Sequence, residues 1–194
     1  MTMPIEPSHI GYGPPSKIWM IYTVPSSLSS LSSSSIINVE VVWEGKRPTR
    51  LRESIWLEVR PTLNTNKEKD DEEVHEEEEW TLFIDKIGQQ VNASDVVKQG
   101  GAALHGMDPS GGVSLVEQKS GRSLSIVSLD CGLVAPGSNT NIWNITAFDK
   151  IPVNAQDGYS FDLYSNLYAV NYPMWYPWLK EDSTSRFRFE VVVV

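Results

Sequence analysis

The chain has little of what disulfides, metal sites and membrane spans require. Its 194 residues include one cysteine, Cys131, and three histidines. A single cysteine cannot form an internal disulfide, so the fold must depend on its apolar core, in which we expect Cys131 to be free and buried. Because the histidines are isolated and zinc needs three or four ligands at workable spacing, we expect no metal or other cofactor. No apolar run approaches the roughly 20 residues of a membrane span, so no membrane partner is expected.

Basic clusters are also missing, and most of the net charge lies in one segment. The formal net charge is −9, of which residues 67–79 (KEKDDEEVHEEEE) contribute −7. The remainder is nearly neutral and lacks the concentrated Lys and Arg that bind phosphate backbones, so we expect no nucleic-acid partner. Like charges at this density repel each other, and the spaced ligands and glycine turn of a calcium loop are missing. The sequence therefore predicts a disordered insertion over residues 64–79.

The length suits one domain with its own core, and we expect it to span residues 1–194. A second insertion, residues 26–35, holds eight serines and is predicted to be a flexible loop. The first fifteen residues contain neither the basic nor the apolar segment of a signal peptide, so the default expectation is a cytoplasmic location.

Short strands separated by Gly, Pro, Ser and Asn turns predict an all-β fold, an antiparallel β-sandwich with long low-complexity loops. Alternation of apolar and polar residues and an enrichment in β-branched and aromatic side chains mark the strands. The expected strands are residues 17–24, 36–43, 54–59, 80–87, 104–105, a strand starting at 113, 124–129 and 186–194.

The sequence also predicts how some of these strands are placed. The strand 17–24 (KIWMIYTV) is apolar on both faces, which predicts a central position, and it should form a hairpin with 36–43. A turn at 108–112 (DPSGG) predicts a second hairpin between the strands that flank it. The four valines that end the strand 186–194 are an aggregation risk unless they are paired.

The segment 161–178 (FDLYSNLYAVNYPMWYPW) is the most unusual part of the sequence. It combines aromatic rings with amides and two prolines, and it has no Lys, Arg or Glu. Aromatic rings stack on the C–H faces of sugars while amides bond to hydroxyls, so this composition indicates carbohydrate binding. An aromatic cluster that only closes the sandwich has the same composition. The candidate binding residues are Asn166, Asn171, Trp175 and Tyr176, with Arg50 and Glu53 as a clamp at the rim or as a solvated ion pair.

Patterns that indicate catalysis are sparse. Two carboxylates could hydrolyse a glycoside, and the candidates in predicted strands and turns are Glu53, Asp130 and Asp162. Spacing alone does not place any two of them together. The G-x-S-x-G elbow of serine hydrolases does not occur. His105 is the one histidine in a predicted strand, where a packed core histidine is the alternative to a catalytic base.

Four stretches, in the same order, resemble one protein family. They are KRPTRLRESIWLEV (46–59), DKIGQQVNASDVVKQGGAALHGM (85–107), LSIVSLDCGLVAPG (124–137) and FDLYSNLYAVNYPMWY (161–176). They are similar to the C-terminal part of large glycoside hydrolase-like proteins whose N-terminal halves are similar to glycoside hydrolase family 38, the α-mannosidases. The resemblance covers most of residues 46–189.

The sequence departs from the family pattern at several positions. Near residues 49–54 the family has T-R-L-P-E-A, and Arg52 stands here in place of the proline. Around residues 130–137 the pattern is D-A-P-L-V-A-P-G, and Cys131 and Gly132 replace its Ala-Pro. In the segment 161–176 the family pattern is close to N-L-Y-N-N-L-W-G-T-N-Y-P-M-W-Y, and the departures include Ser165, Tyr168, Ala169 and Val170. These departures and the two insertions fit a truncated product.

The resemblance implies a terminal β-sandwich module that packs against a catalytic domain and lends loops to its sugar site. The catalytic aspartates and zinc ligands of the mannosidase-like half would lie upstream of this chain. We therefore expect an accessory domain without activity of its own, with a carbohydrate or a mannosidase-like catalytic domain as its partner. The first alternative is a stand-alone carbohydrate-binding module that uses Asn166, Asn171, Trp175 and Tyr176. A small hydrolase that uses His105 ranks below both.

Overall fold

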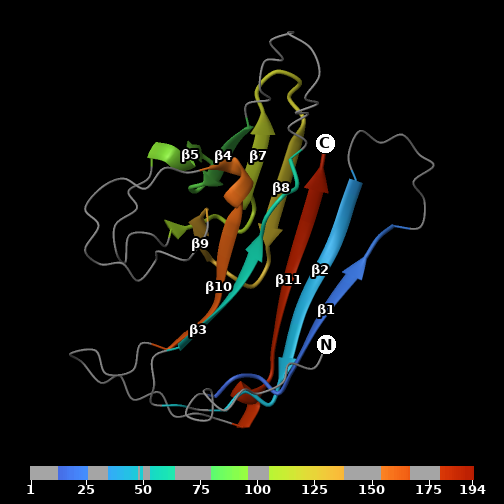
Figure 1. The fold of residues 1–194 in the computed structure, drawn as a ribbon, viewed down its shortest axis with the longest axis vertical. Coiled ribbons are helices and arrows are strands. Elements are labelled where there is room, and N and C mark those ends of the chain that lie inside the picture. Colours follow the sequence, from blue (N-terminus) through green and yellow to red (C-terminus); the bar gives the residue numbers. More distant parts are fainter. Residues whose placement is uncertain are drawn as a thin grey trace, which may run out of the picture.

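The computed structural model of the chain describes residues 13–25, 35–47, 49, 53–63, 80–95, 105–137, 154–166 and 180–194. Within these ranges the secondary structure consists of strands and three short 3₁₀ helices, and the strands form two antiparallel sheets (Figure 1). The predicted all-β sandwich is therefore confirmed. The predicted insertion 64–79 lies outside the described residues, as does residue range 26–34, whereas Ser35 already belongs to a strand.

The larger sheet, sheet A, has seven strands in the order β1-β2-β11-β8-β7-β4-β5. Sheet B has four, in the order β3-β10-β9-β6. The strands of sheet A are β1 (Lys17–Thr23), β2 (Ser35–Glu44), β4 (Trp80–Asp85), β5 (Gln90–Asn92), β7 (Val113–Glu117), β8 (Ser123–Ser128) and β11 (Ser185–Val193). Those of sheet B are β3 (Glu53–Val59), β6 (His105–Gly106), β9 (Leu133–Pro136) and β10 (Tyr159–Asn166). The 3₁₀ helices are η2 (Ala93–Asp95), η5 (Ala155–Asp157) and η6 (Lys180–Ser183).

The core lies between the sheets and follows from the alternation of side chains along each strand. Trp43, Ile84 and Leu115 of sheet A are at most 1% exposed, and Phe161 of sheet B is fully buried. The rings of Phe161 and Phe189 meet edge to face with their centroids 5.2 Å apart, which joins β10 to β11. Ile55, Leu57 and Val59 of β3 and Leu82 and Ile84 of β4 pack in this core, and Cys131 is free and buried as expected.

A buried phenol also ties the two sheets together. The Tyr159 hydroxyl, on β10 of sheet B, lies 2.7 Å from the Phe83 carbonyl oxygen and 2.8 Å from the Ser114 carbonyl oxygen. Phe83 and Ser114 are Cα partners on β4 and β7 of sheet A. One hydroxyl proton therefore serves two buried acceptors. Burial raises the pKa of Tyr159, so this hydroxyl stays protonated.

Two of the predicted placements are wrong. The strand predicted over 17–24 does form a hairpin with its successor, but β1 is an edge strand and is not central. The turn at 108–112 does not close a hairpin, because β6 pairs with β9 in sheet B while β7 pairs with β4 and β8 in sheet A. That turn therefore carries the chain from one sheet to the other. A local turn pattern predicts a change of direction, but it contains no information about which sheet receives the next strand.

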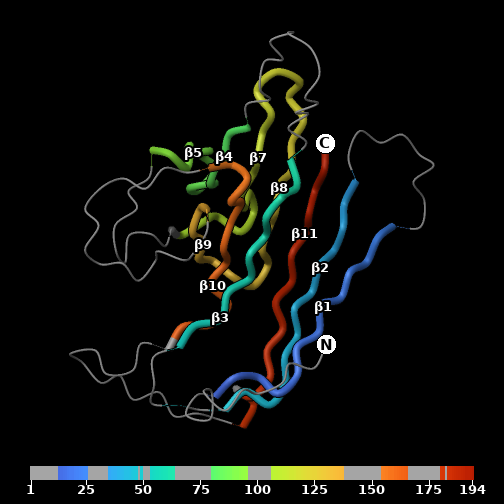
Figure 2. The backbone as a smooth tube through the Cα atoms, in the orientation of Figure 1, coloured from blue at the N-terminus to red at the C-terminus, as the bar shows by residue number. Residues whose placement is uncertain are grey.

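The valine-rich strand β11 is paired with a neighbouring strand on each side. It lies between β2 and β8 and is antiparallel to both. Its backbone hydrogen-bonding groups therefore face neighbours on both sides, which removes the risk attached to an unpaired edge. In Figures 1 and 2, sheet B strands β3 and β10 lie on one side of β11, whereas β1 and β2 lie on its other side.

Candidate functional site

The pairing of β3 with β10 brings two predicted binding residues together. The ladder runs from Tyr159 opposite Val59 to Asn166 opposite Glu53, with a register shift between Asp162 and Tyr164. Asn166 and Glu53 are therefore Cα partners, although they are far apart in the sequence. The first and fourth stretches of the family resemblance, 46–59 and 161–176, thus contribute the paired strands β3 and β10 at one end of sheet B.

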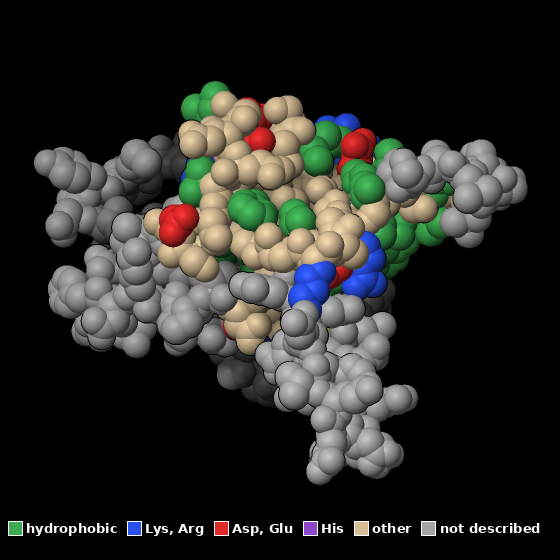
Figure 3. Space-filling view, turned by 90° about the horizontal axis from the view of Figure 1, so that it is seen from above, with side chains coloured by type: hydrophobic (Ala, Val, Ile, Leu, Met, Phe, Trp, Pro, Cys, Tyr) green, Lys and Arg blue, Asp and Glu red, His purple; other side chains and the backbone are tan. Residues whose placement is uncertain are grey.

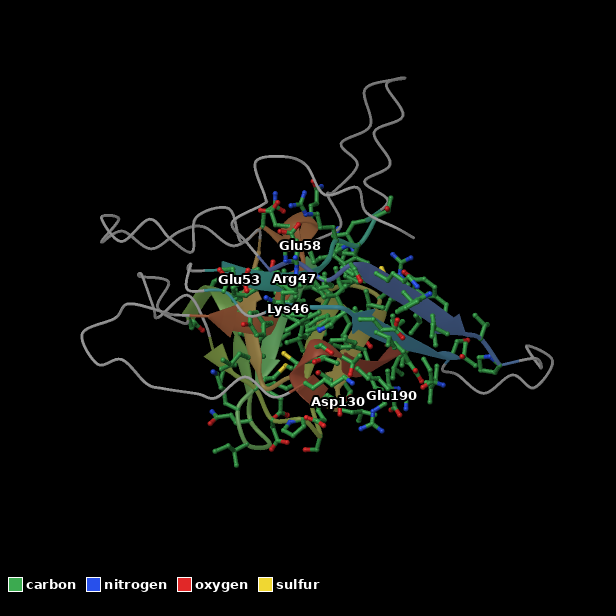
Figure 4. The ribbon with its side chains drawn as sticks, turned by 90° about the horizontal axis from the view of Figure 1, so that it is seen from below. Lys46, Arg47, Glu53, Glu58, Asp130 and Glu190 are labelled. Atoms are coloured by element: carbon green, nitrogen blue, oxygen red, sulfur yellow. The ribbon has the colours of Figure 1, made fainter. Side chains whose placement is uncertain are left out.

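Glu53 is held by a buried lysine at this point. The Lys46 ammonium forms an ion pair with Glu53, with side-chain exposures of 1% and 11%. The same ammonium donates to the Arg47 carbonyl oxygen at 3.1 Å, and it lies 4.5 Å from the centroid of the Tyr164 ring. The second Glu53 oxygen accepts a hydrogen bond from the Gly13 backbone N–H at 3.3 Å. Figure 4 shows Lys46, Arg47 and Glu53 close together.

Two glycines allow the backbone to reach this arrangement. Gly45 follows β2 with a φ of +68°, a conformation that side chains with a Cβ rarely adopt, and it turns the chain so that Lys46 points inward. Gly13 lies so close to the Arg47 carbonyl oxygen that an added Cβ would be 2.0 Å from it. The Lys46 N–H donates to the Ser183 carbonyl oxygen at 3.0 Å, which joins this turn to η6. The Lys46, Glu53 and Tyr164 side chains are called the Lys46 cluster below.

The predicted clamp of Arg50 with Glu53 stays a prediction, because Arg50 lies outside the described residues. In the described part of the chain Glu53 pairs with Lys46, which the sequence reasoning missed. A Gly-Lys pair after a strand has no binding signature of its own, so only its place in the first resemblance block, 46–59, could have pointed to Lys46. Asn166 is described as part of β10 by its backbone alone. The other predicted carbohydrate-binding residues lie outside the described part of the chain; they are Arg50, Asn171, Trp175 and Tyr176.

Asp130 belongs to a second, exposed ion pair. Its carboxylate accepts hydrogen bonds from the Arg188 backbone N–H at 2.8 Å, from Nε at 2.9 Å and from Nη2 at 2.7 Å. These bonds lower the pKa of Asp130, because they favour the charged carboxylate. Arg186 forms a similar two-point pair with Glu40 on the same face of sheet A. Both pairs link neighbouring elements on a solvated surface.

Asp162 is in the opposite situation. It lies on the outer face of sheet B, and its Oδ2 accepts a hydrogen bond from the Ser165 hydroxyl at 2.6 Å. Its Oδ1 is buried without a hydrogen-bond partner. Burial raises the pKa of Asp162, and the Ser165 hydrogen bond offsets part of this effect. The three candidate carboxylates therefore have three separate settings: Glu53 is bound to a lysine, Asp130 to an arginine and Asp162 to a serine.

Other chemistry in the described residues is limited. The Cys131 thiol donates to the Leu133 and Asp162 carbonyl oxygens, and burial raises its pKa, so it has the character of a structural cysteine. His105 is described only as a residue of β6. Within the described ranges no group of three or more His, Cys, Asp or Glu could hold a metal ion. In the same part of the chain no helix is long and apolar enough to cross a membrane.

Comparisons with protein-family models, with curated proteins and with solved structures found no match to this chain.

Proposed function

We propose that this chain is an accessory β-sandwich domain of a glycoside hydrolase-like protein similar to the α-mannosidases, without catalytic activity of its own. The observation that carries the proposal is the union of two segments that resemble this family, 46–59 and 161–166, as the paired strands β3 and β10. The Lys46 cluster holds the two strands together at one end of the ladder. At this end residues 50–52 precede β3 and residues 167–176 follow β10. A pair of strands held together in this way supports the role that the resemblance assigns to the module, which is a rigid base for loops.

The settings of the candidate carboxylates support the absence of catalysis. A glycosidase needs two carboxyl groups that face the substrate about 5–10 Å apart, one of them able to exchange a proton. Glu53 is neutralised by Lys46 and Asp130 by Arg188. Asp162 has a raised pKa, as a general acid would, but its Oδ1 is buried. A carboxyl group in an ion pair or out of contact with solvent is poorly placed to donate a proton to a glycosidic oxygen.

The catalytic part of the proposal is tested with aryl α-mannosides, with and without zinc. The purified chain is expected to give no turnover above the buffer blank. Turnover that co-purifies with the chain and disappears in Glu53→Gln or Asp130→Asn would overturn the proposal. An unchanged rate in both variants would be assigned to a contaminant, and an Asp162→Asn variant completes the set of carboxylates.

The accessory part is tested by co-expression with the mannosidase-like half of a full-length relative. The two chains are expected to co-purify, and the wild-type chain is expected to raise the thermal unfolding temperature of that half. A Lys46→Met variant should weaken this effect, because the base of the loops loses its buried ion pair. Arg186→Met is the matched control, since Arg186 is exposed on the opposite sheet. Failure of the wild-type chain to bind would contradict the accessory role.

A stand-alone carbohydrate-binding module is the second candidate. The pairing of Asn166 with Glu53 favours it, because the backbone places two candidate binding residues opposite each other where the chain enters the aromatic segment. A glycan array tests this candidate with the double variant Trp175→Ser/Tyr176→Ser, which is expected to abolish any binding. Tyr22→Ser is the matched control, since Tyr22 is an exposed aromatic residue on β1 of sheet A. Binding that survives the double variant would remove these residues from the site.

A further inference from the structure

The core face of sheet A continues past the region that sheet B covers. On β1, Ile18, Met20 and Tyr22 are Cα partners of Trp43, Val41 and Val39. These three β2 residues are buried in the core, so all six side chains lie on the same face. Ile18 packs against the core, but Met20 is 48% exposed and Tyr22 is 60% exposed. Apolar side chains are visible at the surface of the molecule in Figure 3.

The opposite face of β1 is also apolar. Trp19 is partly buried, and Ile21 is 45% exposed. The strand therefore presents apolar side chains on both faces at an edge of the sheet, where every second residue also directs its backbone N–H and C=O outward. Natural edge strands are usually protected by a central Lys, by Pro or by a bulge. The sequence of β1, KIWMIYT, has none of these protections between its ends, and its ladder with β2 is regular over all seven residues.

We propose that β1 is a self-association edge, where two copies of this chain pair their β1 strands antiparallel about a two-fold axis and join their sheets A. The inference does not depend on the proposed function. The symmetric register places Met20 opposite Met20 of the second copy, Trp19 opposite Ile21 and Ile18 opposite Tyr22. Each pair is apolar, and aromatic residues opposite β-branched residues are favourable cross-strand pairs.

The distribution of charge on β1 favours a second copy of this chain as the binding partner of the strand. Lys17 is the only charged residue of β1, and it lies opposite Thr23 in this register, so no like charges meet. A partner strand with alternating charged residues would instead bring charges against the apolar faces of β1. The two-fold axis also keeps the core faces of both copies on the same side, so that Met20 and Tyr22 of one copy extend the apolar surface of the other.

The first experiment measures the oligomeric state of the full chain by sedimentation velocity over a concentration series. The wild-type chain is expected to show a monomer–dimer equilibrium. Met20→Lys and Met20→Glu are each expected to shift the dimerisation midpoint to at least about tenfold higher concentration, because symmetry places the like charges opposite each other. An equimolar mixture of the two variants should recover the dimer as a heterodimer, since Lys then faces Glu.

The matched control is Ile87→Lys. Ile87 is 93% exposed in the loop between β4 and β5, at the other end of sheet A, so this variant should leave the midpoint unchanged. Far-UV circular dichroism of each variant checks that the sheets are retained. A wild-type chain that stays monomeric at all concentrations would overturn the proposal. A dimer that both Met20 variants leave intact would overturn it as well.

A crosslinking experiment tests the register independently of charge. Residues directly opposite each other in antiparallel strands have Cα atoms about 4.5–5.5 Å apart, which a disulfide can bridge. Met20→Cys is therefore expected to give a covalent dimer under mild oxidation. Ile36→Cys, a comparably exposed residue on β2, is expected to remain mostly uncrosslinked. Equal crosslinking of the two variants would contradict a β1 interface in this register.

Discussion

The two ends of sheet A have the same apolar pattern on the core face, but among the described strands sheet B covers only one of these ends. At the β4–β7 end, Ile84 and Leu115 are at most 1% exposed because sheet B lies over them. At the β1 end, Met20 and Tyr22 are about half exposed or more. A run of apolar side chains therefore indicates which face of a strand resembles a core, whereas the cover depends on strands from elsewhere in the chain.

The ion pairs show the same contrast between a covered and an exposed setting. The Lys46 and Glu53 side chains are 1% and 11% exposed and lie against the Tyr164 ring. Arg186 and Glu40 are joined by two hydrogen bonds, of 2.6 and 2.9 Å, but are 57% and 29% exposed on the outer face of sheet A. Water can replace either partner of the exposed pair, but it has little access to the buried one. The contribution of an ion pair to the free energy of unfolding should therefore depend more on its burial than on its hydrogen-bond geometry.

The largest effect is expected from the buried pair. Lys46→Met leaves the Glu53 carboxylate without its cation, and the free energy of unfolding should fall by about 3–5 kcal/mol. Arg186→Met should have a small effect, because water solvates the released Glu40 carboxylate. Urea unfolding at neutral pH measures both. The double variant Lys46→Met/Glu53→Gln should recover part of the loss, and equal losses in Lys46→Met and Arg186→Met would contradict the comparison.

The next largest effect on stability is expected when apolar side chains are shortened at the two ends of sheet A. Ile84→Ala opens a cavity beneath sheet B and should lower the free energy of unfolding by about 2–5 kcal/mol. Met20→Ala removes a similar side chain from the uncovered end of the same face, and its effect should stay within about 1 kcal/mol. The measurement is made at a concentration where the chain is monomeric, so that association does not add to stability. A large loss for Met20→Ala would show that the β1 end is covered in solution.

Two tyrosine hydroxyls, one buried and one exposed, allow the same comparison through the loss of a single oxygen atom. Tyr159→Phe leaves the Phe83 and Ser114 carbonyl oxygens without their shared donor, at an expected cost of about 1–3 kcal/mol. Tyr22→Phe removes a hydroxyl with only a weak contact, 3.9 Å from the Met20 sulfur, and should be nearly neutral. Thermal unfolding of the two variants against the wild-type chain measures the difference. A neutral Tyr159→Phe would mean that the two carbonyl groups find other donors.

The sequence predicted the strands and the faces they bury better than it predicted their neighbours. Alternation in 80–87 correctly predicted a strand, of which Leu82 and Ile84 lie in the core, because this pattern is local. The central position predicted for 17–24 was wrong, since apolar residues on both faces also occur in an exposed edge. The hairpin predicted around 108–112 was wrong for a related reason. Whether a strand continues its own sheet or joins the other one is decided by contacts that are distant in sequence.

The candidate site was predictable only in part. Glu53 and Asn166 were chosen because of their side-chain chemistry and the family resemblance, and the β3–β10 ladder makes them Cα partners. Lys46 was missed because a buried lysine has no sequence signal that separates it from the many exposed ones. Its inward course depends on Gly45, on the close approach of Gly13 and on η6, which comes from the end of the chain. The roles of Asn171, Trp175 and Tyr176 stay predictions.

The smallest expected effect concerns two aspartates with opposite pKa shifts. Burial holds the pKa of Asp162 above its ordinary value of 3.8, so the folded chain binds this proton more tightly than the unfolded chain does. Stability from the protonated form is present below pH 3.8 and is lost as the pH rises through the higher folded-state pKa. Arg188 holds the pKa of Asp130 below 3.8. Stability from that carboxylate is present above pH 3.8 and is lost as the pH falls through the lower folded-state pKa.

Asp162→Asn and Asp130→Asn should therefore change stability in opposite directions at neutral pH. Asp162→Asn removes a charge that the fold desolvates, so its unfolding temperature should be higher than that of the wild-type chain. Asp130→Asn loses a carboxylate that Arg188 stabilises, so its unfolding temperature should be lower. The Asp162→Asn difference should shrink as the pH falls through the raised folded-state pKa towards 3.8. The Asp130→Asn difference should shrink below pH 3.8, as the pH falls through the lowered folded-state pKa. Unfolding temperatures measured from acidic to neutral pH decide the matter, and shifts of the same sign in both variants would contradict the assigned environments.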